Sequence, residues 1–353
     1  MFGLHPVMNA SAITPATNAG RWLASVKAPE FQAPATLAEW ATQRAEIKAT
    51  LWKLLGDFPS RPVKPSVQVL SHEDGDGYTL EKFLFDDGVG ASVPGCLFLP
   101  KNAIGKVPAI LYCHWHGGQY DIGKQEMLQT NATPVPPAPT LAKLGYAVLG
   151  IDACGFGERN GQGPGGLQEK GSDGEMTAAK FNLWAGRTLW GMIVRDDLMA
   201  LDYLCSRPEV DAGRIGVTGI SMGSTRAWWL MALDDRLKAG VCVACMTRYQ
   251  DLIRDEMLKA HGIYYFVPGM LQHFDSEAVI ACAAPRAMLF MTGEKDSGSP
   301  VSGVKLIGEK VAPLYQLSGK QDAFENVIFP DVGHVCLPEM WERMVKWMDK
   351  HLR

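Results

Sequence analysis

RIGVTGISMGSTRAWWLMAL, residues 214–233, joins a short apolar run to a helical segment through a glycine-flanked serine. The run 214–218 predicts a buried strand, and 224–233 predicts a helix. Between them, GISMG (219–223) matches G-x-S-x-G, the sharp strand-to-helix turn known as a nucleophile elbow. A Cβ at either glycine of such a turn would strike the neighbouring strand or helix. We therefore predict that Ser221 is an exposed nucleophile at a helix N-terminus.

The composition is that of a globular protein with material for a large apolar core. The 353 residues are 47% hydrophobic and 20% charged, with a net charge of −4. No basic block favours nucleic acid or an anionic membrane surface. No apolar run approaches the roughly 20 residues that span a bilayer, and residues 1–20 lack the regions of a signal peptide. The chain as written predicts a soluble cytoplasmic protein, although an exported protein without its leader would look the same.

The N-terminal third of the chain has its own pattern. Residues 1–35, rich in Ala, Pro and Thr, predict an irregular arm, and 36–353 predict a single catalytic domain. This domain begins with an amphipathic helix that ends near Gly56. Three segments separated by Gly/Asp turns then predict an antiparallel meander. These segments are VQVLSHED (67–74), YTLEKFLFDD (78–87) and VPGCLFLP (93–100).

Farther along, short continuous apolar runs are mostly separated by helical segments. This alternation predicts a parallel sheet that is covered on both faces. The runs are VPAILYCH (107–114), YAVLGID (146–152), RIGVTG (214–219), AGVCVAC (239–245), RAMLFMT (286–292) and NVIFP (326–330). The expected fold class is therefore α/β, with a mostly parallel central sheet, antiparallel N-terminal strands and helices on both faces.

A serine hydroxyl needs a base, and His334 has the sequence context that fits best. In the fold that carries this elbow the order is serine, acid, histidine, so the base must follow Ser221. His334 lies in FPDVGHVCLPEM, between an apolar run and the last helical segment, where a strand's carboxyl end meets a loop. His351 falls within that last helix. His261 and His273 flank GIYYFVPGML and stay open as cleft residues.

The acid that orients the imidazole should follow the preceding apolar run, RAMLFMT. The next residues, GEKDSGSP (293–300), contain both Asp296 and Glu294. We favour Asp296, because Pro300 four residues later predicts a rigid loop that enters the next helix. Glu294 stays the alternative. Asp331, just before the histidine, is typical of a local turn.

Backbone N–H groups must face the oxyanion that forms when a serine attacks an ester carbonyl. One should come from the residue after the nucleophile, Met222. The second should come from HWHGG (114–118), which follows VPAILYCH and whose glycines let the backbone approach a substrate closely. Either His116 or Gly117 is the expected donor, and the register between them stays open.

Two further patterns are weaker evidence for chemistry. His114 and His116 form H-x-H, which begins some metal-hydrolase motifs, but the next carboxylate is only Asp121. A metal site needs three or four ligands. Cys242 and Cys245 form C-x-x-C within a predicted strand and without a second pair. We therefore predict no metal and no cofactor, and we expect the cysteines to be buried reduced thiols.

Two polar stretches and several large side chains are candidates for the cleft. The Pro-rich stretch 127–140 and the Gly-rich stretch 160–176 are longer than most loops, which leaves open a lid, a cleft wall or a plain surface insertion. Aromatic side chains could serve as platforms for a sugar ring or an aryl ester. The candidates for lining the cleft are Trp184, Trp190, Phe266 and Met270.

Three stretches resemble the bacterial acetyl xylan esterase-like branch of the α/β-hydrolases, close to the dienelactone hydrolase group. They are GIDACGFGER (150–159), WGMIVRDDLMALDYL (190–204) and RPEVDAGRIGVTGISMGSTRAWWLMALDDRLKAGV (207–241), and the likeness runs from about Trp40 to the C-terminus. The resemblance implies a serine carboxylesterase, often acting on acetylated carbohydrate, with Ser221, Asp296 and His334 as nucleophile, acid and base.

Two departures from that family pattern limit what the resemblance implies. Dienelactone hydrolases proper use cysteine where this chain has Ser221, so lactone opening is not implied. The family's elbow commonly carries a second glycine where Ser224 stands here, which we expect to affect helix packing only.

The residues and the resemblance together predict a cofactor-independent serine carboxylesterase for short-chain, above all acetyl, esters of small molecules or carbohydrates such as xylan. An acyl-enzyme on Ser221 would be hydrolysed by water activated through His334. The alternative is an oligopeptidase-like serine peptidase, although the N-terminal sequence is too short for the propeller domain of those enzymes. A third hypothesis is a non-catalytic binding protein on the same fold, and such proteins typically lack a member of the triad.

Overall fold

The expected N-terminal arm lies mostly outside the part of the chain that the structure describes. The computed structural model describes Ser25 and residues 27–353. Of the irregular arm expected over 1–35, the described part from 27 onward forms neither helix nor strand. The rest of that prediction falls outside the described residues.

The first described helix, α2 (Leu37–Leu55), begins with a capping box. The Thr36 hydroxyl accepts from the Glu39 N–H at 3.2 Å, and the Glu39 carboxylate accepts from the Thr36 N–H at 3.0 Å. This reciprocal pair satisfies two backbone donors that a helix start otherwise leaves free. The helix therefore starts and ends where the amphipathic pattern predicts.

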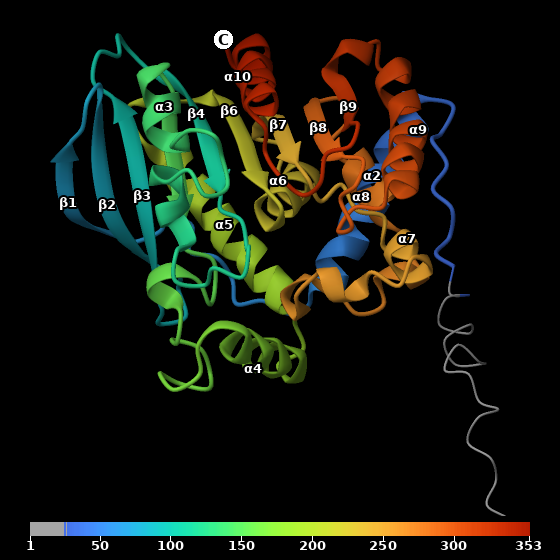
Figure 1. The fold of residues 1–353 in the computed structure, drawn as a ribbon, viewed down its shortest axis with the longest axis horizontal. Coiled ribbons are helices and arrows are strands. Elements are labelled where there is room, and N and C mark those ends of the chain that lie inside the picture. Colours follow the sequence, from blue (N-terminus) through green and yellow to red (C-terminus); the bar gives the residue numbers. More distant parts are fainter. Residues whose placement is uncertain (1–24, 26) are drawn as a thin grey trace, which may run out of the picture.

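All nine strands of the described chain join one sheet, shown in Figure 1. The strands are β1 (Val67–Asp74), β2 (Tyr78–Asp86), β3 (Ser92–Pro100), β4 (Val107–Cys113), β5 (Ala147–Ile151), β6 (Val210–Ile220), β7 (Leu237–Val243), β8 (Ala287–Gly293) and β9 (Phe324–Phe329). Their order across the sheet is β1-β2-β3-β5-β4-β6-β7-β8-β9. Pairs from β1 to β5 are antiparallel, and the pairs from β5 through β4 to β9 are parallel. The expected fold class is confirmed.

Helices cover both faces of the sheet. They are α3 (Pro137–Lys143), α4 (Gly171–Trp184), α5 (Leu189–Ser206), α6 (Met222–Leu233), α7 (Tyr249–Arg254), α8 (Ser276–Ala281), α9 (Val301–Leu317) and α10 (Pro338–Leu352). Figure 1 shows α3 and α10 in front of the sheet, with α5 and α6 behind it. Every residue of β4, β5 and β8 is buried, as strands between two helical layers should be. Within the described residues, none of the helices combines the length and the apolar character that crossing a bilayer requires.

Helix α6, which follows the glycine-flanked serine, is buried along its whole length. Its Arg226 forms two hydrogen bonds, of 2.8 and 2.5 Å, with the Asp197 carboxylate on α5. The same guanidinium donates to the His114 carbonyl just after β4 at 3.3 Å. A planar guanidinium paired in this bidentate way fixes direction as well as distance. The helix is therefore held firmly against both α5 and the end of β4.

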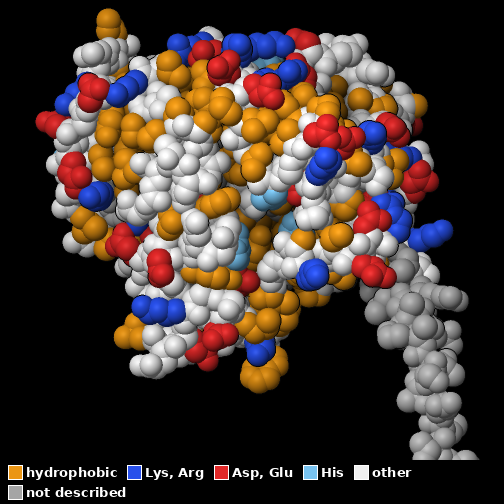
Figure 2. All heavy atoms as spheres, viewed as in Figure 1, with side chains coloured by type: hydrophobic (Ala, Val, Ile, Leu, Met, Phe, Trp, Pro, Cys, Tyr) orange, Lys and Arg blue, Asp and Glu red, His pale blue; other side chains and the backbone are white. Residues whose placement is uncertain are grey.

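Two segments stand at the edge toward which the parallel strands point (Figure 1). One carries α4, which begins inside the Gly-rich stretch 160–176. The other, residues 249–275, carries α7 and three short 3-10 turns. Figure 2 shows histidine side chains in a hollow in the middle of this face of the molecule. Functional groups of parallel sheets gather at the carboxyl ends of the strands, so this edge is where a site is expected.

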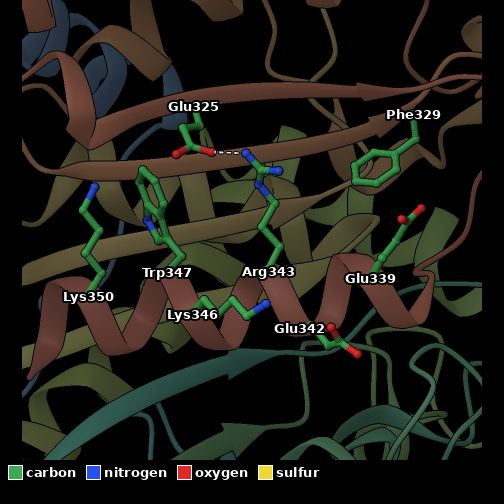
Figure 3. A pocket seen from close by; sticks show the side chains of 8 residues that line it. All are labelled: Glu325, Phe329, Glu339, Glu342, Arg343, Lys346, Trp347 and Lys350. Carbon is green, nitrogen blue, oxygen red and sulfur yellow. Dashed lines mark hydrogen bonds and ion pairs between the residues drawn. The ribbon is translucent and has the colours of Figure 1, made fainter.

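A different hollow, a groove of about 430 Å³ between β9 and α10, has another character (Figure 3). Glu325 on β9 and Arg343 on α10 form an ion pair across it. The other lining residues are Phe329, Glu339, Glu342, Lys346, Trp347 and Lys350. Along α10 the acidic Glu339 and Glu342 precede the basic Arg343, Lys346 and Lys350, and among the described residues no serine, cysteine or histidine lines the groove. The Glu325–Arg343 ion pair joins the last helix to the edge strand, and the groove is not a candidate site for covalent catalysis.

Candidate active site

Ser221 occupies the turn between β6 and α6 with a φ of 58° and a ψ of −119°. Residues other than glycine rarely adopt such a positive φ. A Cβ added at Gly219 would come within 2.4 Å of the Cys113 carbonyl oxygen, and one at Gly223 within 2.0 Å of the same oxygen. Both glycines are thus required because β4 approaches the turn so closely. This confirms the steric expectation drawn from GISMG.

A second strained turn lies beside Ser221, just after β7. Ala244 and Cys245 have positive φ values of 60° and 54°. Two side chains of α6 hold this turn: the Ser224 hydroxyl donates to the Ala244 carbonyl, and Trp228 Nε1 donates to the Cys245 carbonyl at 3.1 Å. Such conformations cost about 1–3 kcal/mol each and persist only where the surroundings enforce them. Ser224, which replaces the family's usual glycine, therefore ties the elbow helix to its neighbouring loop.

His334 lies on the loop after β9, and Asp296 lies on the loop after β8. Nδ1 of His334 is 2.8 Å from Asp296 Oδ2. A carboxylate can only accept, so Nδ1 carries a proton, and in the neutral form of the ring the lone pair is on Nε2. The other carboxylate oxygen accepts from the Gly298 N–H at 2.9 Å, and the Asp296 side chain has no exposed surface. Asp296 is therefore fixed on its own loop, and its hydrogen bond sets the orientation of the His334 ring.

The other two carboxylates weighed as the acid lie on the outer side of these loops. The Glu294 side chain accepts from the Asp331 N–H at 3.2 Å, and Asp331 pairs with Lys295 at 2.6 Å. Backbone bonds join the same loops, because the Lys295 N–H donates to the Val332 carbonyl at 2.8 Å. Glu294 and Asp331 thus help to fasten the loop after β8 to the loop after β9. Among the described residues, Asp296 is the carboxylate bonded to His334.

Ser221, His334 and Asp296 line one cavity of about 470 Å³. This volume lies in the range of small-molecule sites. Ser221 Oγ contacts Cys245 Sγ at 3.9 Å, and no hydrogen bond among the described residues joins it to His334. Catalytic hydrogen bonds are often long or poorly aligned before a substrate binds. The hydroxyl and the imidazole nevertheless face the same space.

Candidate backbone donors lie among the residues that line this cavity or next to them in the chain. Met222 is the first residue of α6, where an N–H has no intrahelical carbonyl to bond. His116 and Gly117 of HWHGG are among the residues that line the cavity. In that loop the Trp115 N–H is used by the buried Glu126 carboxylate at 2.7 Å, and the N–H after Gly117 is used by His116 Nδ1 at 3.0 Å. The sequence left the choice of donor open between His116 and Gly117, and the backbone N–H groups of these two residues form neither of these bonds.

His114, the first histidine of HWHGG, is buried and bonded to backbone on both nitrogens. Its Nε2 accepts from the Ala153 N–H at 3.1 Å, and its Nδ1 donates to the Trp115 carbonyl at 2.7 Å. Burial lowers the pKa of His114 well below its ordinary value, so the ring stays neutral. In the described part of the chain, no cluster of three His, Cys, Asp or Glu side chains is placed to hold a metal ion. All eight cysteines are free thiols.

One residue that the sequence did not single out, Glu175 on α4, reaches the cavity wall. Its Oε2 is 2.9 Å from His116 Nε2 and accepts from the Tyr120 hydroxyl at 3.3 Å. Because His116 Nδ1 accepts a backbone N–H, Nε2 carries the proton that Glu175 accepts. The His116 ring also stacks on Tyr264, with centroids 5.1 Å apart. No sequence signal connects a glutamate in a Gly-rich stretch with a histidine 59 residues earlier.

The four large side chains proposed to line the cleft lie elsewhere. Trp184 is 95% exposed on α4, and Trp190 is fully buried in α5. Phe266 and Met270 line a separate apolar pocket of about 170 Å³ in the α7 segment. None of the four is among the residues that line the cavity of Ser221, whose wall carries the aromatic ring of Tyr264 instead. Residue size alone did not distinguish the aromatic rings that pack in the core from those that line a ligand cavity.

Comparison with known proteins identifies the family of the chain. The model of the Abhydrolase family matches residues 23–327. The chain is 36% identical over 312 residues to the candidate hydrolase YtaP of Bacillus subtilis, which covers 88% of this chain and 100% of that protein. The family match and this relative extend over most of the chain, so they show its family.

Solved structures show the same fold. A candidate acetyl xylan esterase from Bacteroides fragilis superposes with a TM-score of 0.71 at 18% identity, over 94% of this chain and 93% of that one. A glucuronoyl esterase from Solibacter usitatus gives a TM-score of 0.63 at 20% identity, over 92% and 98%. The resemblance drawn from the sequence is confirmed. The chain therefore belongs to the Abhydrolase family and adopts the α/β-hydrolase fold.

Proposed function

We propose that the protein is a serine carboxylesterase that removes short acyl groups, above all acetyl, from carbohydrate or other small-molecule esters. One observation carries the proposal: Ser221 on its strained turn and His334 bonded to the buried Asp296 line a single cavity. Serine, acid and histidine in this chain order are the nucleophile, orienting acid and base of the α/β-hydrolase fold. The names of the relatives, a hydrolase and two esterases, support the same class.

In acylation, His334 Nε2 takes the hydroxyl proton as Ser221 Oγ attacks the ester carbonyl. Asp296 keeps Nδ1 protonated and stabilises the imidazolium from a buried position. The oxyanion is stabilised by the Met222 N–H at the start of α6 and by a backbone N–H from 116–117. The imidazolium then returns the proton to the leaving alcohol oxygen, and the acyl group remains on the serine.

In deacylation, a water molecule attacks the acyl carbonyl while His334 takes one of its protons. The same backbone donors stabilise the second oxyanion. As this intermediate collapses, the His334 imidazolium returns the proton to Ser221 Oγ, which restores the hydroxyl and releases the carboxylic acid. The bonds that form and break in the proposed reaction involve only the ester, Ser221, the His334 imidazole and water. The proposed reaction therefore needs no cofactor.

The wall of the cavity favours a polar alcohol and a small acyl group. Cys245 stands 3.9 Å from the nucleophile, which restricts the room next to Oγ. Long apolar acyl chains need a continuous apolar channel, whereas polar side chains interrupt this wall. Its polar members besides the triad are His116, Lys259, His261 and Ser297.

A panel of substrates tests the proposal. Initial rates are measured on p-nitrophenyl esters from acetyl to octanoyl, on acetylated xylo-oligosaccharides and on an aminoacyl p-nitroanilide. We expect kcat/KM to fall with acyl length, acetate to be released from the oligosaccharides, and the anilide to be left intact. Ser221→Ala should lower kcat by about 10³- to 10⁶-fold, and Ser318→Ala, at the end of α9, is the matched control. Hydrolysis of the anilide without hydrolysis of the esters would instead favour a peptidase.

A further inference from the structure

His261 lines the same cavity as the triad, and two contacts fix its ring. It lies in the segment 249–275, and its Nε2 is 2.9 Å from the Gly298 carbonyl oxygen. The ring stacks on Tyr265 with centroids 4.4 Å apart and planes 14° from parallel. Tyr265 is itself buried at 4% exposure, so it gives the imidazole a firm backing. The orientation of His261 is therefore set by the protein.

The partner of Nε2 determines which tautomer is present. A carbonyl oxygen only accepts, so Nε2 of His261 carries the proton and Nδ1 has a lone pair. The Gly298 carbonyl also accepts from the Thr247 hydroxyl at 2.7 Å, so both of its lone pairs have partners. Burial lowers the pKa of His261 below its ordinary value, which keeps the ring neutral at neutral pH. Nδ1 is thus a hydrogen-bond acceptor.

Nδ1 of His261 has no protein partner among the described residues. No group of the described chain donates a hydrogen bond to this atom, and the atom is not among the fully buried polar atoms. A lone pair in this position is paired with solvent until a donor of suitable shape displaces the water. Because the residue borders the cavity that holds Ser221, such a donor would be part of the bound ester.

The other two histidines that line the cavity have no nitrogen left to accept a hydrogen bond from the alcohol part of an ester. In the proposed mechanism, His334 Nε2 is committed to the proton of Ser221. His116 uses both of its nitrogens within the protein. A Cβ at Gly298 would lie 3.7 Å from His261 Nε2 and 3.9 Å from His334 Nδ1, so these two imidazoles flank the same glycine. The rings of His261 and His334 therefore lie on either side of Gly298 and line the same cavity.

We infer that His261 is a specificity residue whose Nδ1 accepts a hydrogen bond from a free hydroxyl of the alcohol, on a carbon next to the esterified one. The inference rests on the proposed esterase function and adds the class of alcohol: a partly acylated sugar or polyol with a neighbouring hydroxyl. A site built to bond a hydroxyl discriminates against an analogue without it, because the acceptor loses water and gains no partner. An ether at the same position cannot donate and is disfavoured too.

Three acetates of one ring size test this inference. They are trans-2-hydroxycyclohexyl acetate, its 2-methoxy ether and unsubstituted cyclohexyl acetate. We expect the native protein to hydrolyse the hydroxy acetate with a kcat/KM about 10-fold above the other two, the effect of one hydrogen bond. The methoxy compound keeps the size and the oxygen, so it separates donation of a hydrogen bond from polarity.

Two substitutions separate the two nitrogens of His261. His261→Gln keeps a donor near Nε2, toward Gly298, but removes the acceptor at Nδ1, so the preference for the hydroxyl should fall to about 1. His261→Asn keeps an acceptor near Nδ1 and loses the donor, so the preference should remain even where the overall rate falls. His72→Gln, on the exposed edge strand β1, is the control and should change neither quantity.

A native-like preference in His261→Gln would overturn the inference. So would a native protein that hydrolyses cyclohexyl acetate and shows no preference for the hydroxy compound. Both results leave the proposed esterase function intact. If the folded native protein turns over none of the three acetates, the proposed function itself fails, and the inference fails with it.

Discussion

Two histidine–carboxylate pairs border the cavity, at nearly equal distances and with different consequences. His334 lies 2.8 Å from Asp296, and His116 lies 2.9 Å from Glu175. His334 bonds its carboxylate through Nδ1 and keeps Nε2 for the serine, whereas His116 bonds its carboxylate through Nε2 and fills Nδ1 with a backbone N–H. Both rings have a carboxylate partner, so it is the partner of the other ring nitrogen that distinguishes them. His334 is the candidate base, whereas the ring of His116 holds a loop in place.

The two pairs also differ in what they connect. Asp296 and His334 lie on the loops after the neighbouring strands β8 and β9, which hydrogen bonds fasten together. Glu175 lies on α4, outside the sheet, and reaches back to the loop after β4. The first pair is built on the rigid scaffold, as a site that must hold its geometry should be. The second couples an outer helix to the loop that carries the oxyanion donors of the proposed mechanism.

The largest effect in this comparison should come from breaking the His334 pair. Asp296→Asn should lower kcat on p-nitrophenyl acetate by about 10⁴-fold, because an amide NH₂ facing Nδ1 favours the tautomer that cannot take the serine proton. Circular dichroism checks that the fold is kept. Glu294→Gln, two residues earlier on the same loop, is the matched control and should leave kcat unchanged. A large loss in Glu294→Gln and a small one in Asp296→Asn would make Glu294 the acid.

The same chemical change in the other pair should have a much smaller effect. Glu175→Gln keeps an amide oxygen that can accept the His116 Nε2 proton, and no proton moves through this pair in the proposed mechanism. We expect kcat to fall by no more than about 10-fold, a loss of positioning and not of chemistry. Steady-state kinetics with Glu342→Gln on α10 as the control measure this difference. A loss comparable to that of Asp296→Asn would contradict the division of roles between the two pairs.

The sequence predicted the fold and the first pair because both depend on local patterns and chain order. GISMG carries a steric requirement that the Cys113 carbonyl imposes, so the turn at Ser221 could be read directly. Strands of a parallel sheet end at one edge, so residues just after the β8 and β9 runs were expected to meet there. Asp296 was favoured over Glu294 from the form of its loop, and the structure places Asp296 next to His334.

The second pair and the acceptor on His261 depend on three-dimensional position, which no local pattern carries. Helix α4 starts in a Gly-rich polar stretch that the sequence left as a lid, a wall or an insertion, so Glu175 had no visible partner. The tautomer of His261 follows from one carbonyl, that of Gly298, on a distant loop. The predictions for Trp184 and Trp190 were wrong for a different reason. Their size favoured them as platforms for a ligand, but Trp184 is almost fully exposed to solvent and Trp190 is buried in the core.

The central claim, that Ser221 is the activated nucleophile of a hydrolase, is tested most directly by intact-mass analysis after reaction with a fluorophosphonate. We predict one adduct per chain, located on the peptide that contains Ser221, absent from Ser221→Ala and formed far more slowly in Asp296→Asn. A folded native protein that takes up no adduct, or that carries it on another residue, would contradict the account.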